Sequence, residues 1–176
     1  MLYLRKIKTE AWQNKSPRDS DSISDLGTTN HELSVWEVSD KDNLMEIALA
    51  FAMTQSKISD FVAVLLDPDE IENKVGLKLT ILDNPGQTLY KAKTFYHKDF
   101  ILENVDHMIK LAEYIHDIIG SENADLVKPF NVIDLKNELE RIVKNGEIKI
   151  EDFEDDKNKG GQWGKAVKAI NKNIKE

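Results

Sequence analysis

The sequence contains no cysteine, and this absence excludes several kinds of chemistry. A chain without thiols has no disulfides, no thiolate nucleophile, no cysteine-ligated zinc and no iron–sulfur cluster. It also suits a reducing compartment, and we predict a cytoplasmic protein. No glycine-rich phosphate loop and no HExxH-type zinc pattern is present. We therefore expect no cofactor and no resident metal.

Long apolar segments are missing as well. The longest nearly apolar run, residues 47–53, is far shorter than the roughly 20 residues of a membrane-spanning helix. The N-terminus reaches Arg5 and Lys6 too soon for a signal peptide. We therefore predict no membrane partner. Hydrophobic residues make up 40% and charged residues 32% of the 176 positions, which is typical of a globular chain with one core.

The sign of the net charge differs between most of the chain and its last twenty residues. Residues 157–176 hold six lysines and one acid, whereas residues 1–156 hold 18 basic and 31 acidic residues. An acidic body does not bind nucleic acid by itself, because neutralising phosphates requires clustered lysine or arginine. Such a separation of charge indicates contacts between oppositely charged surfaces.

The hydrophobic periodicity predicts an α+β, or mixed α/β, fold. Strand patterns lie at residues 2–8, 33–38, 61–66 and 77–82. Residues 40–55 predict a helix that is apolar nearly all round and therefore buried, and residues 99–120 predict a long amphipathic helix capped by Asp99. We expect a sheet of about four strands covered by these two helices. Residues 32–66 form a candidate βαβ unit, right-handed if its strands pair in parallel.

The remaining segments carry weaker signals. The polar residues 13–30 predict a long loop, residues 89–96 form either a return strand or a loop, and residues 147–150 resemble a short strand. After a polar linker at 121–130, helices are predicted at 132–144 and 162–174. We divide the chain into an α+β core domain, residues 1–120, and a helical C-terminal region, residues 121–176, which either packs on the core or is semi-independent.

A cluster of carboxylates follows the most apolar predicted strand. Asp67, Asp69 and Glu70 lie where ligands gather in open α/β sheets. With His31 from the long loop, they are the candidate catalytic residues of a metal-assisted or acid–base hydrolase. The alternative is structural, because Asp67 and Glu70 can cap a short helix that Pro68 opens.

Two apolar stripes are candidates for binding a partner. In the long helix, Ile101, Val105 and Met108 begin a heptad-like stripe; this helix either lies across its own sheet or is shared with a partner. The last helix combines an apolar stripe headed by Trp163 with a basic face that consists of Lys165, Lys168, Lys172 and Lys175. It packs on the acidic segment 147–156, docks on an acidic partner, or contacts nucleic acid or a membrane surface.

Taken together, these patterns favour a non-catalytic interaction protein over an enzyme. It would be an acidic adaptor, an inhibitor of the immunity type, or an accessory subunit, and its partner would be another protein or a second copy of itself. Acidic proteins cover basic surfaces well, because charge attraction speeds their encounter. The hydrolase is the first alternative, and nucleic-acid contact through the last helix is the weaker one.

Overall fold

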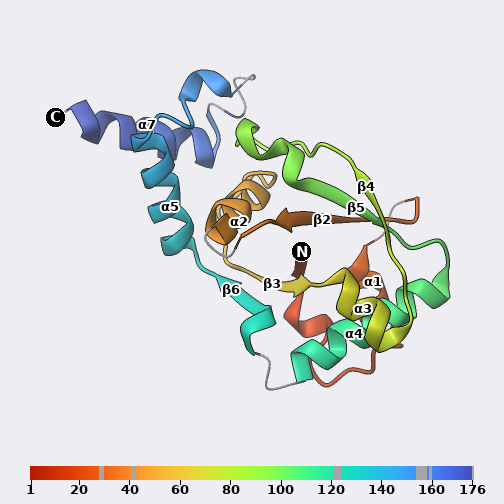
Figure 1. Cartoon of the computed structure of the whole chain (residues 1–176). Coiled ribbons are helices and arrows are strands. Elements are labelled where there is room, and N and C mark those ends of the chain that lie inside the picture. Colours follow the sequence, from red (N-terminus) through yellow and green to blue (C-terminus); the bar gives the residue numbers. More distant parts are fainter. Residues whose placement is uncertain (28–29, 41–42, 121–123, 154–157, 159, 176) are drawn as a thin grey trace.

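A computed structural model describes residues 1–27, 30–40, 43–120, 124–153, 158 and 160–175. It is an α+β fold in which helices cover both faces of one sheet (Figure 1). The strands are β1 (Leu2–Ile7), β2 (Glu32–Val38), β3 (Phe61–Leu66), β4 (Thr80–Asp83), β5 (His97–Ile101) and β6 (Val127–Phe130). The α-helices are α1 (Ser20–Leu26), α2 (Leu44–Ala52), α3 (Pro68–Val75), α4 (Val105–Gly120), α5 (Val132–Lys144) and α7 (Gln162–Lys175). Short 3₁₀ segments are η1 (Thr9–Ala11), η3 (Lys91–Tyr96), η4 (Ala124–Leu126) and η5 (Ile150–Asp152).

The sheet has six strands in the order β4-β5-β2-β1-β3-β6, not about four. Every neighbouring pair is antiparallel. Tyr3 of β1 pairs with Glu37 of β2 on one side and with Leu66 of β3 on the other. The strands β2 and β3 therefore run in the same direction, but β1 lies between them. The predicted βαβ unit is thus a crossover with an antiparallel strand inserted between its two strands.

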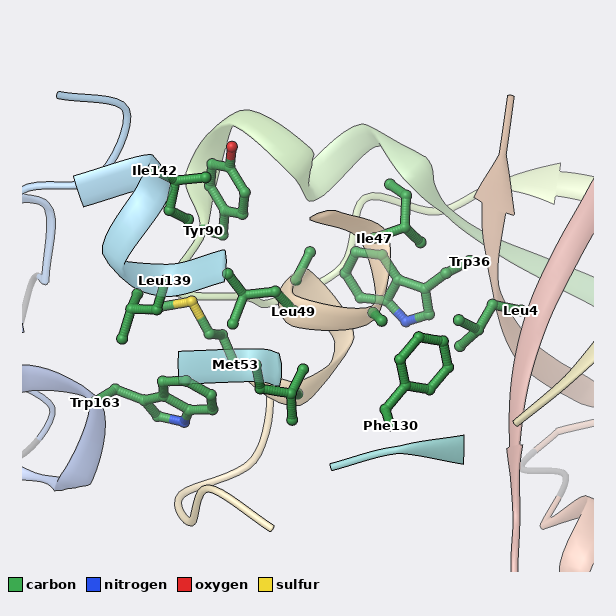
Figure 2. Packing of buried hydrophobic residues seen from close by; sticks show 14 of the residues in the cluster. Leu4, Trp36, Ile47, Leu49, Met53, Tyr90, Phe130, Leu139, Ile142 and Trp163 are labelled. Carbon is green, nitrogen blue, oxygen red and sulfur yellow. The ribbon is translucent and has the colours of Figure 1, made fainter. Parts of the chain in front are cut away.

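Alternation along the strands divides the interior into two hydrophobic clusters. In β3, Ala63 and Leu65 belong to one cluster and Val64 and Leu66 to the other, because successive side chains of a strand point to opposite faces. This confirms that residues 61–66 are a strand covered on both faces. The first cluster is covered by the helices α2, α5 and α7, which we call the α2 layer, and part of it is seen in Figure 2. The second is covered by α1, α3 and α4, which we call the α4 layer.

The prediction of one helix over residues 99–120 was wrong at its start. Residues 97–101 form β5, which pairs with both β2 and β4, and α4 begins only at Val105. Asp99 is therefore a buried strand residue whose carboxylate accepts hydrogen bonds from Ser34 and Asn84. The first turn of α4 is capped instead by Asn104, whose Oδ1 accepts the backbone N–H of His107 at 3.0 Å.

The predicted loop at 13–30 also contains a helix. Its second half folds as α1, with Leu26 buried in the α4-layer cluster. Nη2 of Arg5 donates to the backbone oxygens of Asp25 and Leu26 at 3.2 and 2.6 Å. It satisfies carbonyls that the end of a helix leaves without partners. A short polar helix is thus stabilised by a tertiary contact that local composition does not reveal.

Other segments differ less from expectation. The fourth predicted strand is the edge strand β4, shifted to Thr80–Asp83, and residues 91–96 are η3, not a return strand. Residues 147–150 form no strand, since η5 begins at Ile150. The predicted linker contributes β6, which pairs with β3. The helices α5 and α7 lie where the sequence predicts them. Among the described residues, no helix has the length and apolar character needed to cross a membrane.

Candidate interaction surface

The carboxylate of Asp67 is committed to a backbone contact. Its Oδ1 accepts the N–H of Asp69 at 3.0 Å, and Pro68 occupies the first position of α3. This is the geometry of a helix N-cap, which satisfies one of the free N–H groups of the first turn. The helix ends at Gly76, whose φ of 64° lies in the left-handed region that favours glycine. The turn that follows β3 is thus explained by helix formation alone.

The neighbouring acids of α3 face solvent. Asp69 and Glu70 are exposed, and Glu70 pairs with Lys74 at 3.7 Å. Beneath them Tyr114 of α4 is fully buried, with Nζ of Lys74 5.7 Å from the centre of its ring. Burial, and secondarily the charge of Glu70, raises the pKa of Tyr114 to about 12. A phenol with so high a pKa stays neutral at physiological pH, so α3 packs against an uncharged Tyr114 side chain.

His31 lies at the opposite end of the sheet from Asp67. Leu66 and Glu37 both pair with Tyr3, so Asp67, which follows Leu66, lies near the end of β2. His31 precedes Glu32 and therefore lies at the start of β2. The Nδ1 of His31 lies 3.2 Å from the backbone oxygen of Leu102. The candidate catalytic residues are therefore not brought together. Within the described ranges, no group of three or more histidine or acidic side chains is arranged to hold a metal ion.

Exposed carboxylates gather instead on the outer side of the α4 layer. Together we call them the acidic face; they are Asp21, Asp69, Glu70, Glu72, Glu103, Asp106 and Asp117. Six of them lie on α1, α3 and α4, where α4 contacts both α1 and α3, and Glu103 lies two residues before α4. Four of these acids have a lysine partner 3.0–3.7 Å away. Asp69, Glu72 and Glu103 form no ion pair with any residue that the structure describes, so the face retains a local excess of negative charge.

The predicted stripe of Ile101, Val105 and Met108 is divided between two elements. Ile101 belongs to β5, Val105 opens α4 with 64% of its surface exposed, and Met108 packs on the α4-layer cluster. Further along the helix, Ala112 and Ile115 are buried against the protein's own sheet. The three residues therefore do not form a single helical seam.

The last helix buries its apolar stripe in the α2 layer. Trp163 is buried (Figure 2), and its Nε1 donates to the backbone oxygen of Gln55 at 2.8 Å. Val167 is also fully buried. The side chains of Lys165, Lys168 and Lys172 are exposed. Lys175 ends the helix, but its side chain lies outside the described part, as do residues 154–157 of the acidic segment. The helix α7 therefore lies on the opposite side of the sheet from α1, α3 and α4 (Figure 1).

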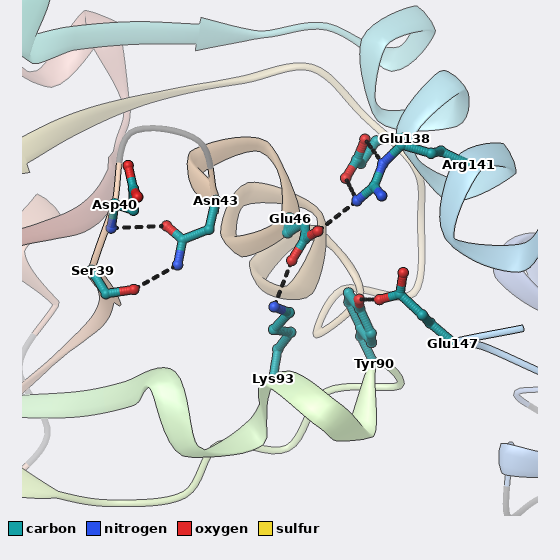
Figure 3. Close-up of polar contacts among 9 residues, drawn as sticks. All are labelled: Ser39, Asp40, Asn43, Glu46, Tyr90, Lys93, Glu138, Arg141 and Glu147. Carbon is teal, nitrogen blue, oxygen red and sulfur yellow. Dashed lines mark hydrogen bonds and ion pairs between the residues drawn. The ribbon is translucent and has the colours of Figure 1, made fainter. Parts of the chain in front are cut away.

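A polar cluster joins α5 and the turn after it to α2 and η3 (Figure 3). The sequence did not predict this cluster. Glu46 of α2 contacts Nζ of Lys93 and Nη2 of Arg141, each at 2.5 Å. Arg141 also contacts Glu138 on its own helix at 2.7 Å. Partial burial alone would raise the pKa of Glu46, but the hydrogen bonds and charges of Lys93 and Arg141 outweigh this effect and lower it. The one sequence signal for this cluster is a lone acid in an otherwise apolar helix.

A second contact of this cluster involves Tyr90. Its ring is fully buried, and its hydroxyl donates to Oε2 of Glu147 at 2.5 Å. Burial first, and the adjacent Glu147 next, raises the pKa of Tyr90. The residues of this cluster hold η3, α5 and the turn after α5 against α2, so their role is to fasten the α2 layer.

Comparisons with protein-family models, with curated proteins and with solved structures found no match.

Proposed function

We propose that this is a non-catalytic acidic protein that binds a basic surface of another protein through its acidic face. The observation that carries the proposal is the excess of exposed carboxylates on the outer side of three packed helices. Such a surface attracts a basic partner over long distances and orients its approach. An adaptor, an inhibitor of the immunity type and an accessory subunit all fit this description.

The surroundings of the other candidate residues support the same proposal. Asp67 caps α3, and His31 lies at the far end of the sheet. An acid–base pair needs its members within hydrogen-bond reach of one substrate, and these two side chains do not meet this condition. The hydrolase alternative therefore has no geometric support among the described residues.

The experiment first identifies the protein that co-purifies with this chain in a fixed stoichiometry when the chain is present at its native abundance. Association is then measured between about 20 and 150 mM salt for the native protein and for a triple variant, Asp69→Asn, Glu72→Gln and Glu103→Gln. A matched control removes three charges elsewhere through Glu32→Gln, Glu140→Gln and Glu151→Gln. Both triple variants change the net charge equally, so a difference between them reports position and not total charge.

We expect the association rate of the native protein to fall roughly tenfold over this salt range, because exposed charges are screened within about 10 Å at 0.1 M salt. The acidic-face variant should associate more slowly than the control, with a smaller change in the dissociation rate. An association rate indifferent to salt, or equal rates for the two variants, would contradict the proposal. Sedimentation velocity tests whether the partner is a second copy.

Contact with nucleic acid is the second candidate, and one observation favours it. Lys165, Lys168 and Lys172 are exposed on the same helix. Removing the helix would also remove Trp163 from the core, so the sharper test replaces the three lysines by glutamine. Retention on single-stranded DNA or RNA that is lost in this variant, and that weakens with salt, would support this candidate. Absence of retention by the native protein would reject it.

A further inference from the structure

One cavity of the molecule is separate from the acidic face and from the polar cluster of Figure 3. It has a volume of about 370 Å³ and lies between η1, the end of α4 and the strands β1, β3 and β6. Its walls are Ile7, Thr9, Trp12, Gln13, Val62, Ile118, Ile119 and Val127. The volume falls in the range of small-molecule sites, which are concave, mostly apolar and largely preformed.

The described residues that line this cavity are uncharged, although 32% of the chain is charged. Six of its eight residues are aliphatic or aromatic, and a charged ligand would lose its hydration there without gaining a counter-ion. The two polar residues, Thr9 and Gln13, make no side-chain hydrogen bond to any part of the chain that the structure describes. The hydroxyl of Thr9 and the amide of Gln13 are therefore available to form hydrogen bonds with a ligand at the rim of this largely apolar cavity.

The walls are held in place by contacts outside the cavity. Trp12 is buried, and its Nε1 donates to Oδ2 of Asp25 at 2.7 Å. The same oxygen accepts the backbone N–H of Lys8 at 2.9 Å. Ile7 is fixed by β1 pairing with β3, where it faces Val62. Because these groups are already ordered, binding of a ligand would not include the conformational-entropy cost of ordering them.

From these observations we infer that the cavity is a binding site for a small, uncharged, largely apolar molecule that carries a hydrogen-bonding group. Apolar surface of the ligand is enclosed by Ile118, Ile119 and Val127, and its polar group meets Thr9 or Gln13 at the rim. This site is independent of the proposed interaction with a basic protein, so either proposal stands if the other fails.

The probe for the test is N-phenyl-1-naphthylamine, a neutral aromatic amine whose fluorescence rises in apolar surroundings. We expect the full-length protein to bind one equivalent saturably, with a dissociation constant of about 100 µM or tighter. Ile119→Trp fills the cavity and should abolish this binding. Val105→Trp makes a comparable change on the same helix at an exposed position outside the cavity, and it should leave binding intact.

A second variant tests the polar rim. Thr9→Val keeps the side-chain shape and removes the hydroxyl, and we expect affinity for the amine to fall about 2- to 10-fold, as for the loss of one hydrogen bond. Thermal melts of each variant show whether it is folded, and amide chemical shifts locate the probe. The inference is overturned if the native protein shows no saturable binding, if Ile119→Trp binds as well as Val105→Trp while folded, or if the shifts lie away from the cavity.

Discussion

At the scale of single residues, the acidic side chains of this protein have different structural roles that depend on the groups around them. Asp67 accepts a backbone N–H, Asp99 is buried between neutral donors, and Glu46 is shared by two cations. Asp69 and Glu72 have no ion-pair partner in the described part of the chain and face solvent. A count of carboxylates therefore says little about function until each one has been assigned its contacts.

The capping role of Asp67 leads to the first prediction. Replacing it by alanine should lower the free energy of unfolding by about 1 kcal/mol, because the first turn of α3 loses a hydrogen-bond acceptor. Asp67→Asn keeps an acceptor and should change stability far less. Urea unfolding followed by circular dichroism measures both. Equal losses for the two substitutions would show that charge, and not capping, is what Asp67 contributes.

The lowered pKa of Glu46 leads to a pH-dependent prediction. The ionised carboxylate is favoured in the folded protein, so its stabilising effect is complete above the ordinary pKa of 4.5 and is lost as the pH falls through the lower folded pKa. Glu46→Gln should cost about 1–2 kcal/mol at pH 7, because Lys93 and Arg141 lose a charged partner. The difference from the native protein should shrink as the pH falls below about 4.5.

The matched control for Glu46 is Glu140→Gln. Glu140 pairs with Lys144 at 2.5 Å, but both side chains are about half exposed, so the loss should be about 0.5 kcal/mol or less. Chemical denaturation of the three proteins between pH 3 and 7 gives the comparison. A cost for Glu46→Gln that is independent of pH would contradict the assigned ionisation.

At the scale of elements, the last helix behaves as part of the core. Its apolar stripe contacts the α2-layer cluster, and the side chain of Gln162 accepts the backbone N–H of Ile58 at 2.8 Å. The helix α5 packs between α2 and α7, and Arg141 joins it to Glu46. We propose that the C-terminal region, residues 121–176, packs on the core and unfolds with it.

Trp163→Ala tests this proposal. Removing a buried tryptophan should cost about 3–5 kcal/mol, and a single cooperative transition should shift to lower temperature or denaturant concentration. The exposed neighbour Lys165 supplies the control, since Lys165→Ala should change stability by less than about 0.5 kcal/mol. Two separate transitions, with only one of them moved by Trp163→Ala, would show that the C-terminal region is semi-independent.

At the scale of the whole molecule, the central strands are protected on all sides. β1 pairs with β2 and β3, and each face of the sheet is covered by a helical layer. The edge strand β4 is four residues long and carries the exposed Leu82. The arrangement places the acidic face on the α4 layer and the exposed lysines of α7 on the α2 layer, where Asp134, Glu140 and Glu151 are also exposed.

Amide hydrogen exchange should reproduce this order of protection. Amides of β1 and β3 should exchange only through global unfolding, while those of β4 should exchange faster by local opening, because few buried contacts hold an edge strand. Exchange followed by NMR measures both in one experiment. Amides of β4 as slow as those of β1 would show that the edge is covered, for example by a second copy.

Several elements could be predicted because their signals are local. Residues 61–66 are continuously apolar, and residues 132–144 repeat apolar positions at helical spacing, so both elements form where expected. Residues 99–101 were assigned to the wrong element because Ile101 continues the helical spacing of α4 and Asp99 resembles a helix N-cap. What makes them a strand is pairing with β2 and β4, which are distant in sequence.

The candidate sites also differ in whether their signals lie within one segment of the sequence or come from distant segments. Asp67 and Pro68 are adjacent, so helix capping could be foreseen as one of two alternatives. The contacts of Glu46 with Lys93 and Arg141 join residues 47 and 95 positions apart, and no pattern within one segment connects them. The cavity beside Trp12 likewise draws on five elements, so its uncharged lining becomes visible only after folding.

Local patterns in the sequence were enough to establish the class of fold, the buried strand β3, the helices α2, α5 and α7, and the net positive charge of the last twenty residues. These features depend on periodicity, capping and composition, which act between residues close in the chain. Tertiary packing, in contrast, settled that β1 separates β2 from β3, that Trp163 is buried in the core, and that the acidic face and the lysines of α7 belong to different helical layers. Such features depend on which strands and helices become neighbours, and that choice is made by packing the whole chain around two shared hydrophobic clusters.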